Sequence, residues 1–178
     1  MHSSLLFFPG ALLSQPELNS ARLDGLLIEV GDGYMPPDLP EDAPARVASL
    51  APILVPGYAL SGPTAAWVHG TGNAPPARHH LQRVSARRQR VHAPRGVVLH
   101  DVLLDADDIE IVGRTPVTTA LRTLTDLALA ARSDDAAAHW MRCLADSRRD
   151  LLAHAIAHVE SRPRLPGKLA ALSMLRSV

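Results

Sequence analysis

The chain has 178 residues, of which 47% are hydrophobic and 3% aromatic, so it can form one domain, or one domain with a small appendage, around an aliphatic core. The 18 basic and 18 acidic residues give a net charge of zero, and the single cysteine, Cys143, excludes an internal disulfide and a Cys-based zinc site. The sequence contains no run of 18 apolar residues, and no basic segment precedes the apolar residues 5–8. We therefore expect neither a transmembrane helix nor a signal peptide, and a cytoplasmic protein without membrane contacts.

Residues 1–40 predict a short helix followed by a β-hairpin. Ser14 and Glu17 have the spacing of a capping box and Pro16 is tolerated in a first turn, which predicts a helix at about 16–23. A strand is expected at 26–30, a turn at 31–33 and a returning arm at 34–36. This order is that of the second half of a winged helix, so the segment is either a winged-helix remnant or a packing appendage. The proline-rich residues 36–40 predict a stiff linker.

Residues 41–178 predict an α+β domain with a small mixed sheet flanked by helices and a helical last third. The apolar spacing at 43–54 indicates a helix that Pro52 kinks or ends, and a second helix is expected at 64–69, before Gly70. Strands are expected at 58–60, 81–84, 97–100 and 109–112. Because residues 97–100 are nearly all apolar, we expect them to form a central strand.

The last third of the chain predicts four helices. The first begins at Thr118 or Thr119, and Arg122 and Asp126 stand four residues apart in it, as a pair on one helix face would. The others are expected at 135–147, 150–160 and 167–176. The side chains expected on the buried faces are Leu121, Leu124, Leu127, Ala128, Trp140, Met141, Leu144, Leu152, Ile156, Val159, Leu169, Leu172 and Leu175.

The charge is distributed unevenly along the chain. Residues 43–100 contain seven arginines and no Asp, Glu or Lys, a formal charge of +7, whereas residues 1–42 carry −6. Residues 101–135 carry −5 and residues 136–178 carry +4. Such an asymmetry can create a local positive field although the net charge is zero.

An arginine cluster between positions 78 and 95 is the candidate binding site. Guanidinium groups bind phosphates bidentately, and their neutralisation of phosphates releases counterions. Aromatic residues are almost absent, so duplex DNA or an acidic protein surface fits this cluster better than stacked single-stranded bases. Alternatively, acids from residues 1–42 and 101–135 fold onto this face and neutralise it. The candidate DNA-binding residues are Arg78, Arg83, Arg87, Arg88, Arg90 and Arg95.

The other groups of histidine, cysteine and acidic residues are interpreted as structural. Five histidines lie between positions 69 and 100, but no carboxylate or cysteine stands between them, and His139 and Cys143 lack further ligands, so no metal or cofactor is expected. The acids at 105, 107, 108 and 110 lack the lysine of a magnesium nuclease centre and are interpreted as solvated loop residues. There is no nucleophile elbow or phosphate-binding loop, so no catalytic residue is identified. An unrecognised nuclease is the minority alternative.

Several segments together resemble the AbiEi family of type IV toxin–antitoxin antitoxins, in its actinobacterial form. They are residues 23–25, 31–34, 64–70, 97–101, 104–109, 117–128 and 165–168, within a resemblance that spans about residues 20–176. The most specific is Val-Thr-Thr-x-x-Arg-Thr-x-x-Asp-Leu-Ala at 117–128.

The resemblance implies a cytosolic, non-enzymatic antitoxin with an N-terminal winged helix that binds operator DNA, followed by an α+β domain that opposes a nucleotidyltransferase-like toxin. Here residues 1–40 are too short for a complete winged helix, so DNA contacts are expected mainly from the arginine cluster. The resulting prediction is a DNA-binding regulator of this kind. The alternative is a protein-interaction module that neutralises or scaffolds such a partner without binding DNA, through residues 101–135 and the C-terminal helices.

Overall fold

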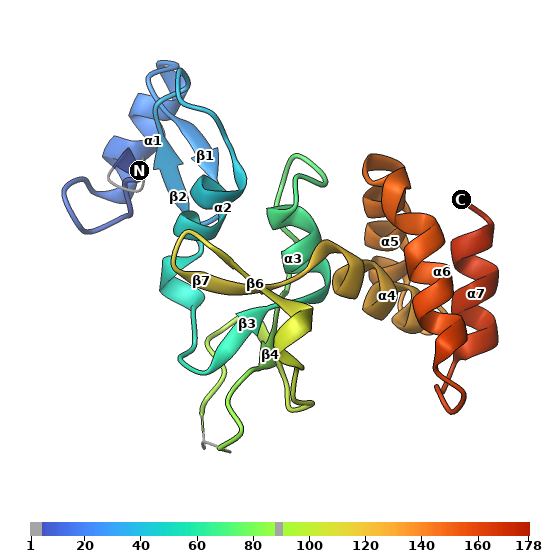
Figure 1. Cartoon of the computed structure of the whole chain (residues 1–178). Helices are drawn as coiled ribbons and strands as arrows, with labels where there is room; N and C mark the ends of the chain where they lie inside the picture. The colour runs from blue at the N-terminus through green and yellow to red at the C-terminus, as the bar shows by residue number, and fades with distance from the viewer. Residues whose placement is uncertain (1–4, 88–90) are drawn as a thin grey trace.

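A five-stranded mixed sheet lies at the centre of the computed structural model, which describes residues 5–87 and 91–178 (Figure 1). The strand order is β5-β4-β3-β7-β6. Strand β3 pairs antiparallel with β4 and parallel with β7, while β4 and β5 are parallel and β6 and β7 antiparallel. The strands are β3 (Tyr58–Leu60), β4 (His79–Arg83), β5 (Val97–His100), β6 (Ile109–Val112) and β7 (Thr115–Thr118). The predicted α+β class is confirmed.

The expectation that residues 97–100 form a central strand is wrong, because β5 is an edge strand. Its apolar composition has another cause. Val97 is buried and Leu99 packs against the main core, so every second side chain of the strand faces the interior. Burial of one face of an edge strand therefore produced a run that resembles a strand buried on both faces.

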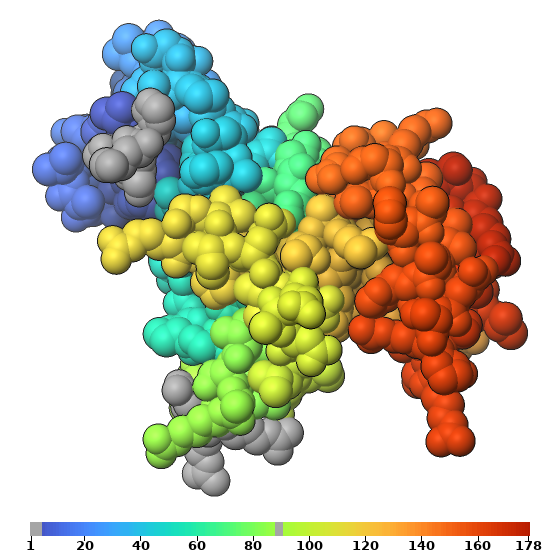
Figure 2. Space-filling model, viewed as in Figure 1, coloured from blue at the N-terminus to red at the C-terminus, as the bar shows by residue number. Residues whose placement is uncertain are grey.

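Helix α4 (Ala120–Ala130) connects the sheet to the helical last third of the chain. It packs against α3 (Gly62–Val68), α5 (Asp135–Ser147), α6 (Leu152–Ser161) and α7 (Lys168–Arg176). Helices α5, α6 and α7 form a separate lobe on the right of Figure 1, and Figure 2 shows a notch between this lobe and the sheet. The main core extends from the sheet into the lobe of α5, α6 and α7, and it includes the fully buried Trp67, Leu124 and Met141.

The predicted burial of the last helix is correct for Leu172 and Leu175 but wrong for Leu169, which is 84% exposed. Steps of three residues drift by about 60° around an α-helix of 3.6 residues per turn. Leu169 therefore lies about 120° away from Leu175 around the helix axis. The buried face is completed by Ala171.

The N-terminal part consists of α1 (Gln15–Leu23), the hairpin of β1 (Ile28–Val30) and β2 (Gly33–Met35), and α2 (Ala43–Ser49), which continues into a 3₁₀ turn at Ala51–Ile53. The capping box is present, with Ser14 N donating to Glu17 Oε2 at 2.7 Å. Leu18, Leu27 and Tyr34 form a small cluster of their own, whereas the hairpin contributes Val30 to the main core. Residues 5–40 therefore have a local core and remain attached to the rest of the protein.

Within the described residues, no helix has the length and apolar character needed to cross a membrane.

Candidate nucleic-acid interface

Arg78 and Arg95 lie at the same end of the sheet. They precede β4 and β5, which run parallel with His79 opposite Val97, and His79 N donates to Gly96 O at 2.9 Å. Both arginines are exposed. Two of the predicted binding residues, 17 positions apart in sequence, therefore come close together through the parallel pairing of the strands that follow them.

Arg83, at the other end of β4, is held by the chain itself. Its Nε donates to Asp101 O at 3.1 Å and lies 3.2 Å from an Asp101 carboxylate oxygen. Its Nη1 donates to the carbonyl oxygens of Ser85 and Ala86, and only 12% of the side chain is exposed. This guanidinium group satisfies the backbone where the strand ends and ties that end to the residue after β5, so it is not available as a free phosphate ligand.

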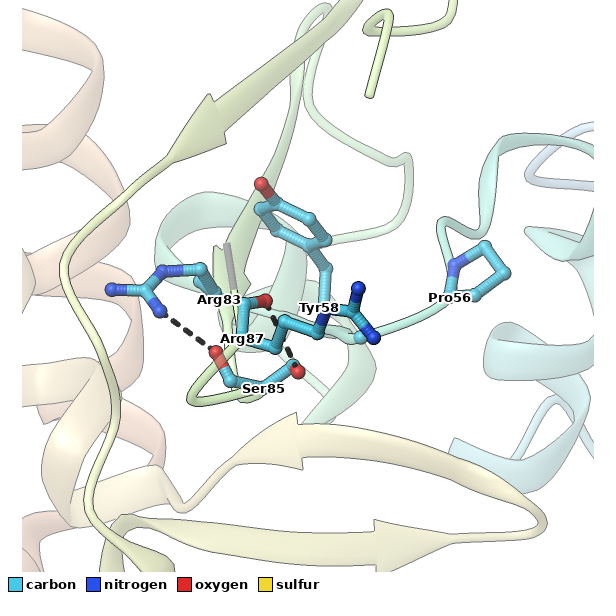
Figure 3. A pocket seen from close by; sticks show the side chains of 6 residues that line it. Pro56, Tyr58, Arg83, Ser85 and Arg87 are labelled. Carbon is cyan, nitrogen blue, oxygen red and sulfur yellow. Dashed lines mark hydrogen bonds between the residues drawn. The ribbon is translucent and has the colours of Figure 1, made fainter. Parts of the chain in front are cut away.

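Arg87 is exposed and lies beside Arg83 (Figure 3). Together with Pro56, Tyr58 and Ser85 it lines a depression too shallow to hold a water molecule. The Ser85 hydroxyl donates to Arg87 O at 3.3 Å. The predicted residues Arg88 and Arg90 lie outside the described part of the chain. Figure 1 shows the segments on either side of them extending from the body of the protein at its lower edge.

The seventh arginine of the acid-free segment, Arg46, is buried. It forms an ion pair with Glu41 at 2.8 Å, donates to the carbonyl oxygens of Trp67 and Gly72, and lies 5.0 Å above the Trp67 ring. Acids from both flanking segments therefore do neutralise two of the arginines, Arg46 and Arg83. For Arg78, Arg87 and Arg95 the described part of the structure contains no ion pair.

The 117–128 string forms the junction between β7 and α4. Arg122 Nε donates to Asp126 Oδ2 at 2.7 Å, which confirms the predicted pair, and Nη1 binds Asp108. Burial alone would lower the pKa of Arg122, but the carboxylates of Asp126 and Asp108 raise it. The prediction that Asp108 is a solvated loop acid is wrong, because its side chain is only 14% exposed and forms an ion pair with Arg122.

Threonine and histidine side chains complete this junction. Thr119 Oγ1 caps α4 by accepting from Arg122 N at 3.2 Å, and the Thr118 and Thr123 hydroxyls lie 2.7 Å apart. His69 Nε2 donates to Thr118 O at 2.8 Å and fixes the end of α3 to β7. The most specific string of the family resemblance therefore joins secondary-structure elements to one another.

A pocket beside β4 brings together residues that the sequence did not connect. Its polar lining comes from Ser61, His80, Gln82, His100, Asp126 and Asp134, and its volume is about 140 Å³. His80 Nδ1 and His100 Nε2 are 3.0 Å apart. Burial, followed by the proximity of His100, lowers the pKa of His80 to about 4, and burial also lowers that of His100. The two-residue spacing of His80 and Gln82 is a signal for one strand face, but His80 lies outside the strand expected at 81–84 and inside β4.

The other histidines and the cysteine that the structure describes are not grouped around a common point. Among the described residues, no three His, Cys, Asp or Glu side chains are arranged to hold a metal ion. Cys143 Sγ lies 3.7 Å from His139 Nε2, as expected for packing neighbours on one helix.

Comparisons with known proteins add little to this description. No protein-family model matches the sequence, and a search of curated proteins finds no match. Among solved structures, the chain is similar to the RV2827C protein from Mycobacterium tuberculosis, with 17% identity and a TM-score of 0.37 over 89% of this chain and 69% of that one. Similarity at this level carries no inference about function.

Proposed function

We propose that this protein is a non-enzymatic, antitoxin-like transcriptional regulator of a type IV toxin–antitoxin system and that it binds double-stranded DNA through an arginine surface. We use this name for Arg78, Arg87 and Arg95, the exposed described arginines of an acid-free segment. The supporting observation is that these three guanidinium groups have no ion-pair partner in the described residues, whereas Arg46 and Arg83 do. Unpaired surface guanidinium groups are suited to phosphates.

The spacing of the arginine surface favours an extended, repeating ligand. Arg78 and Arg95 precede β4 and β5, and Arg87 follows β4. The five residues of β4, at about 3.3 Å per residue, separate these two places by roughly 16 Å. A duplex presents phosphates over such a distance. Both tryptophans are buried, so this surface offers no tryptophan ring on which single-stranded bases could stack.

The N-terminal part gives less support for phosphate contacts than the arginine surface does. Residues 1–42 carry −6, and the exposed part of α1 includes Glu17. A negative surface repels the DNA backbone. The proposal therefore assigns DNA contact to the arginine surface, while residues 5–40 serve as a packed appendage.

A salt titration of DNA binding tests the proposal. We expect the affinity for duplex DNA, measured by fluorescence anisotropy, to fall steeply with salt. The combined substitutions Arg78→Ala, Arg87→Ala and Arg95→Ala should reduce the slope of log K against log salt by about 2 to 3, because each phosphate contact contributes about 0.9.

The matched control removes the same charge elsewhere. Arg132, Arg142 and Arg164 are also exposed, and the described structure gives them no ion pair. Their combined replacement by Ala should leave the slope nearly unchanged. Absence of binding at low salt, or an equal loss of slope in this control, contradicts the DNA-binding function.

A second candidate function is a protein-interaction module that binds a nucleotidyltransferase-like toxin without binding DNA. The exposed face of β6 favours it, since Ile111 is 66% exposed and the exposed acids Asp105 and Asp107 precede this strand. Apolar side chains rimmed by charges are typical of protein contacts. Co-expression with the product of the neighbouring gene, followed by co-purification, tests this candidate. Capture of that product should be abolished by Ile111→Ser and retained in the variant that lacks Arg78, Arg87 and Arg95.

A further inference from the structure

The pocket beside β4 has two acidic side chains in its lining and no Arg or Lys. It lies where Ser61 enters α3, between β4, β5 and the helices α4 and α5, and neither Arg nor Lys is among its lining residues. Asp126 and Asp134 each contribute a carboxylate. The charge of the pocket at neutral pH therefore depends on the two histidines that face it.

Those histidines are neutral. The His80 and His100 nitrogens approach to 3.0 Å while the ring centroids are 5.2 Å apart, so the nitrogens lie between the rings and point at each other. One ring donates a hydrogen bond and the other accepts it, which requires no positive charge. The lowered pKa values of both groups agree with this state. With neutral imidazoles the lining is negative, because Asp134 has no ion pair in the described residues, whereas the charge of Asp126 is partly offset by its ion pair with Arg122.

Three oxygen atoms of the lining residues have unused capacity to accept hydrogen bonds. Arg122 engages Oδ2 of Asp126, and Oδ1 of Asp134 caps α5, so that one oxygen of each carboxylate has no partner in the described residues. The Ser61 hydroxyl is buried, with the residue only 2% exposed, and it also lacks a partner. Unpaired buried hydroxyls are uncommon in proteins and indicate a ligand or a water molecule.

We infer that this pocket binds a small organic cation with N–H donors, an ammonium or a guanidinium group. The negative lining selects for positive charge and the free oxygens accept from its N–H groups. An anion is disfavoured by the two carboxylates. A metal ion is disfavoured because the imidazole nitrogens point at each other and the described residues contain no set of three ligands.

The volume is sufficient for a cationic headgroup. A cavity of about 150 Å³ holds a benzene molecule, so the 140 Å³ here can accommodate one guanidinium or ammonium group. The group could belong to a free amine or to the side chain of a partner protein. Both sources present the same chemistry to the pocket.

Titration of the ¹⁵N-labelled full chain with methylguanidinium, followed by amide chemical shifts, tests the inference. We expect saturable shifts at Ser61, Gly62 and His80. Methylurea, the neutral isostere, should give none at equal concentration. Saturation by methylurea with the same affinity overturns the inference, as does the absence of saturable shifts with methylguanidinium.

Substitutions at two adjacent residues at the start of α5 provide the matched pair. Asp134→Asn removes the charge in the pocket but retains an N-cap residue of equal quality, and we expect about fivefold weaker binding. Ser61→Ala, which breaks no hydrogen bond in the described structure, should weaken binding about twofold. Asp135→Asn removes the adjacent exposed charge outside the pocket and should leave the affinity unchanged. Equal losses of affinity in Asp134→Asn and Asp135→Asn would indicate a general electrostatic attraction by the surface and would overturn the assignment to the pocket.

Two further probes distinguish the sources of the cation. Tighter binding of agmatine than of N-acetyl-arginine amide supports a free amine, and the reverse order supports a side chain presented by a partner. Tighter binding of Zn²⁺ or Mg²⁺ than of either, at the same residues, overturns the inference in favour of a metal site.

Discussion

The two ends of the segment from Arg78 to Arg122 use the same side chain in opposite ways. Arg122 is 11% exposed and lies between Asp108 and Asp126, at the point where β7 meets α4. Arg78 is exposed, precedes β4, and has no ion pair within the described residues. The first holds elements together and the second is open to a ligand. Arginine content alone therefore does not identify a binding surface, because the burial and pairing of each guanidinium group decide its role.

The largest expected effect is a loss of stability on replacement of the buried Arg122. Arg122→Ala leaves the carboxylates of Asp108 and Asp126 largely buried without their partner, and we expect the free energy of unfolding to fall by about 3 kcal/mol. Urea denaturation followed by circular dichroism measures it. Arg114→Ala, at an exposed arginine nearby, should change stability by less than about 0.5 kcal/mol. Comparable stabilities of the two variants would show that the junction does not depend on Arg122.

A smaller effect on stability distinguishes Arg83 from Arg78, which stand at opposite ends of β4. Arg83→Ala removes hydrogen bonds to three backbone carbonyl groups, and should lower the free energy of unfolding by about 1 to 2 kcal/mol. It should not change the salt dependence of DNA binding. Arg78→Ala should leave stability within about 0.5 kcal/mol and reduce the salt slope by about 1. If urea denaturation instead shows the larger loss of stability for Arg78→Ala, and the salt titration shows the larger loss of slope for Arg83→Ala, the roles assigned to these residues are reversed.

The smallest expected effect is the pH dependence of stability that comes from His80. Its pKa is about 4 in the folded protein and 6.5 in the reference state, so between these values the unfolded chain binds more protons. Stability should therefore decrease as the pH falls from 6.5 towards 4, by on the order of 1 kcal/mol after allowance for solvent screening.

The groups that face His80 define the control for this prediction. They are His100 and His79, Asp134, and Arg78. Urea midpoints at several pH values, compared between the wild type and His80→Gln, isolate the contribution of His80. If the free energy of unfolding of His80→Gln has the same pH dependence as that of the wild type, the pKa of His80 does not differ between the folded and unfolded states.

Local patterns predicted the secondary structure well because they depend on neighbouring residues. The helix expected at 135–147 has those bounds, and the expected pair of Arg122 and Asp126 forms because both residues lie on one helix face. The position of β5 at the edge of the sheet could not be predicted in this way. Strand order is decided by contacts between distant segments, and a half-buried edge strand can have the same composition as a central one.

The candidate sites were harder to predict than the fold. Arg83 and Arg78 look equivalent in the sequence, and they differ in the structure because Asp101 and the carbonyl groups of Ser85 and Ala86 bind only Arg83. The acidic pocket was not predicted at all, since its polar residues come from β4, β5, α4 and the starts of α3 and α5. No spacing in the sequence connects Ser61 with Asp134.

The parallel pairing of β3 with β7 also determines when this protein can fold during synthesis. Leu60 of the central strand lies opposite Val117, roughly sixty residues later in the chain. At about 5 to 20 residues per second, a ribosome needs about 3 to 12 s to supply the second strand. Throughout that interval one edge of β3 has no strand to pair with, so the nascent chain presents an open sheet edge that can pair with other polypeptides until the 117–128 string has emerged.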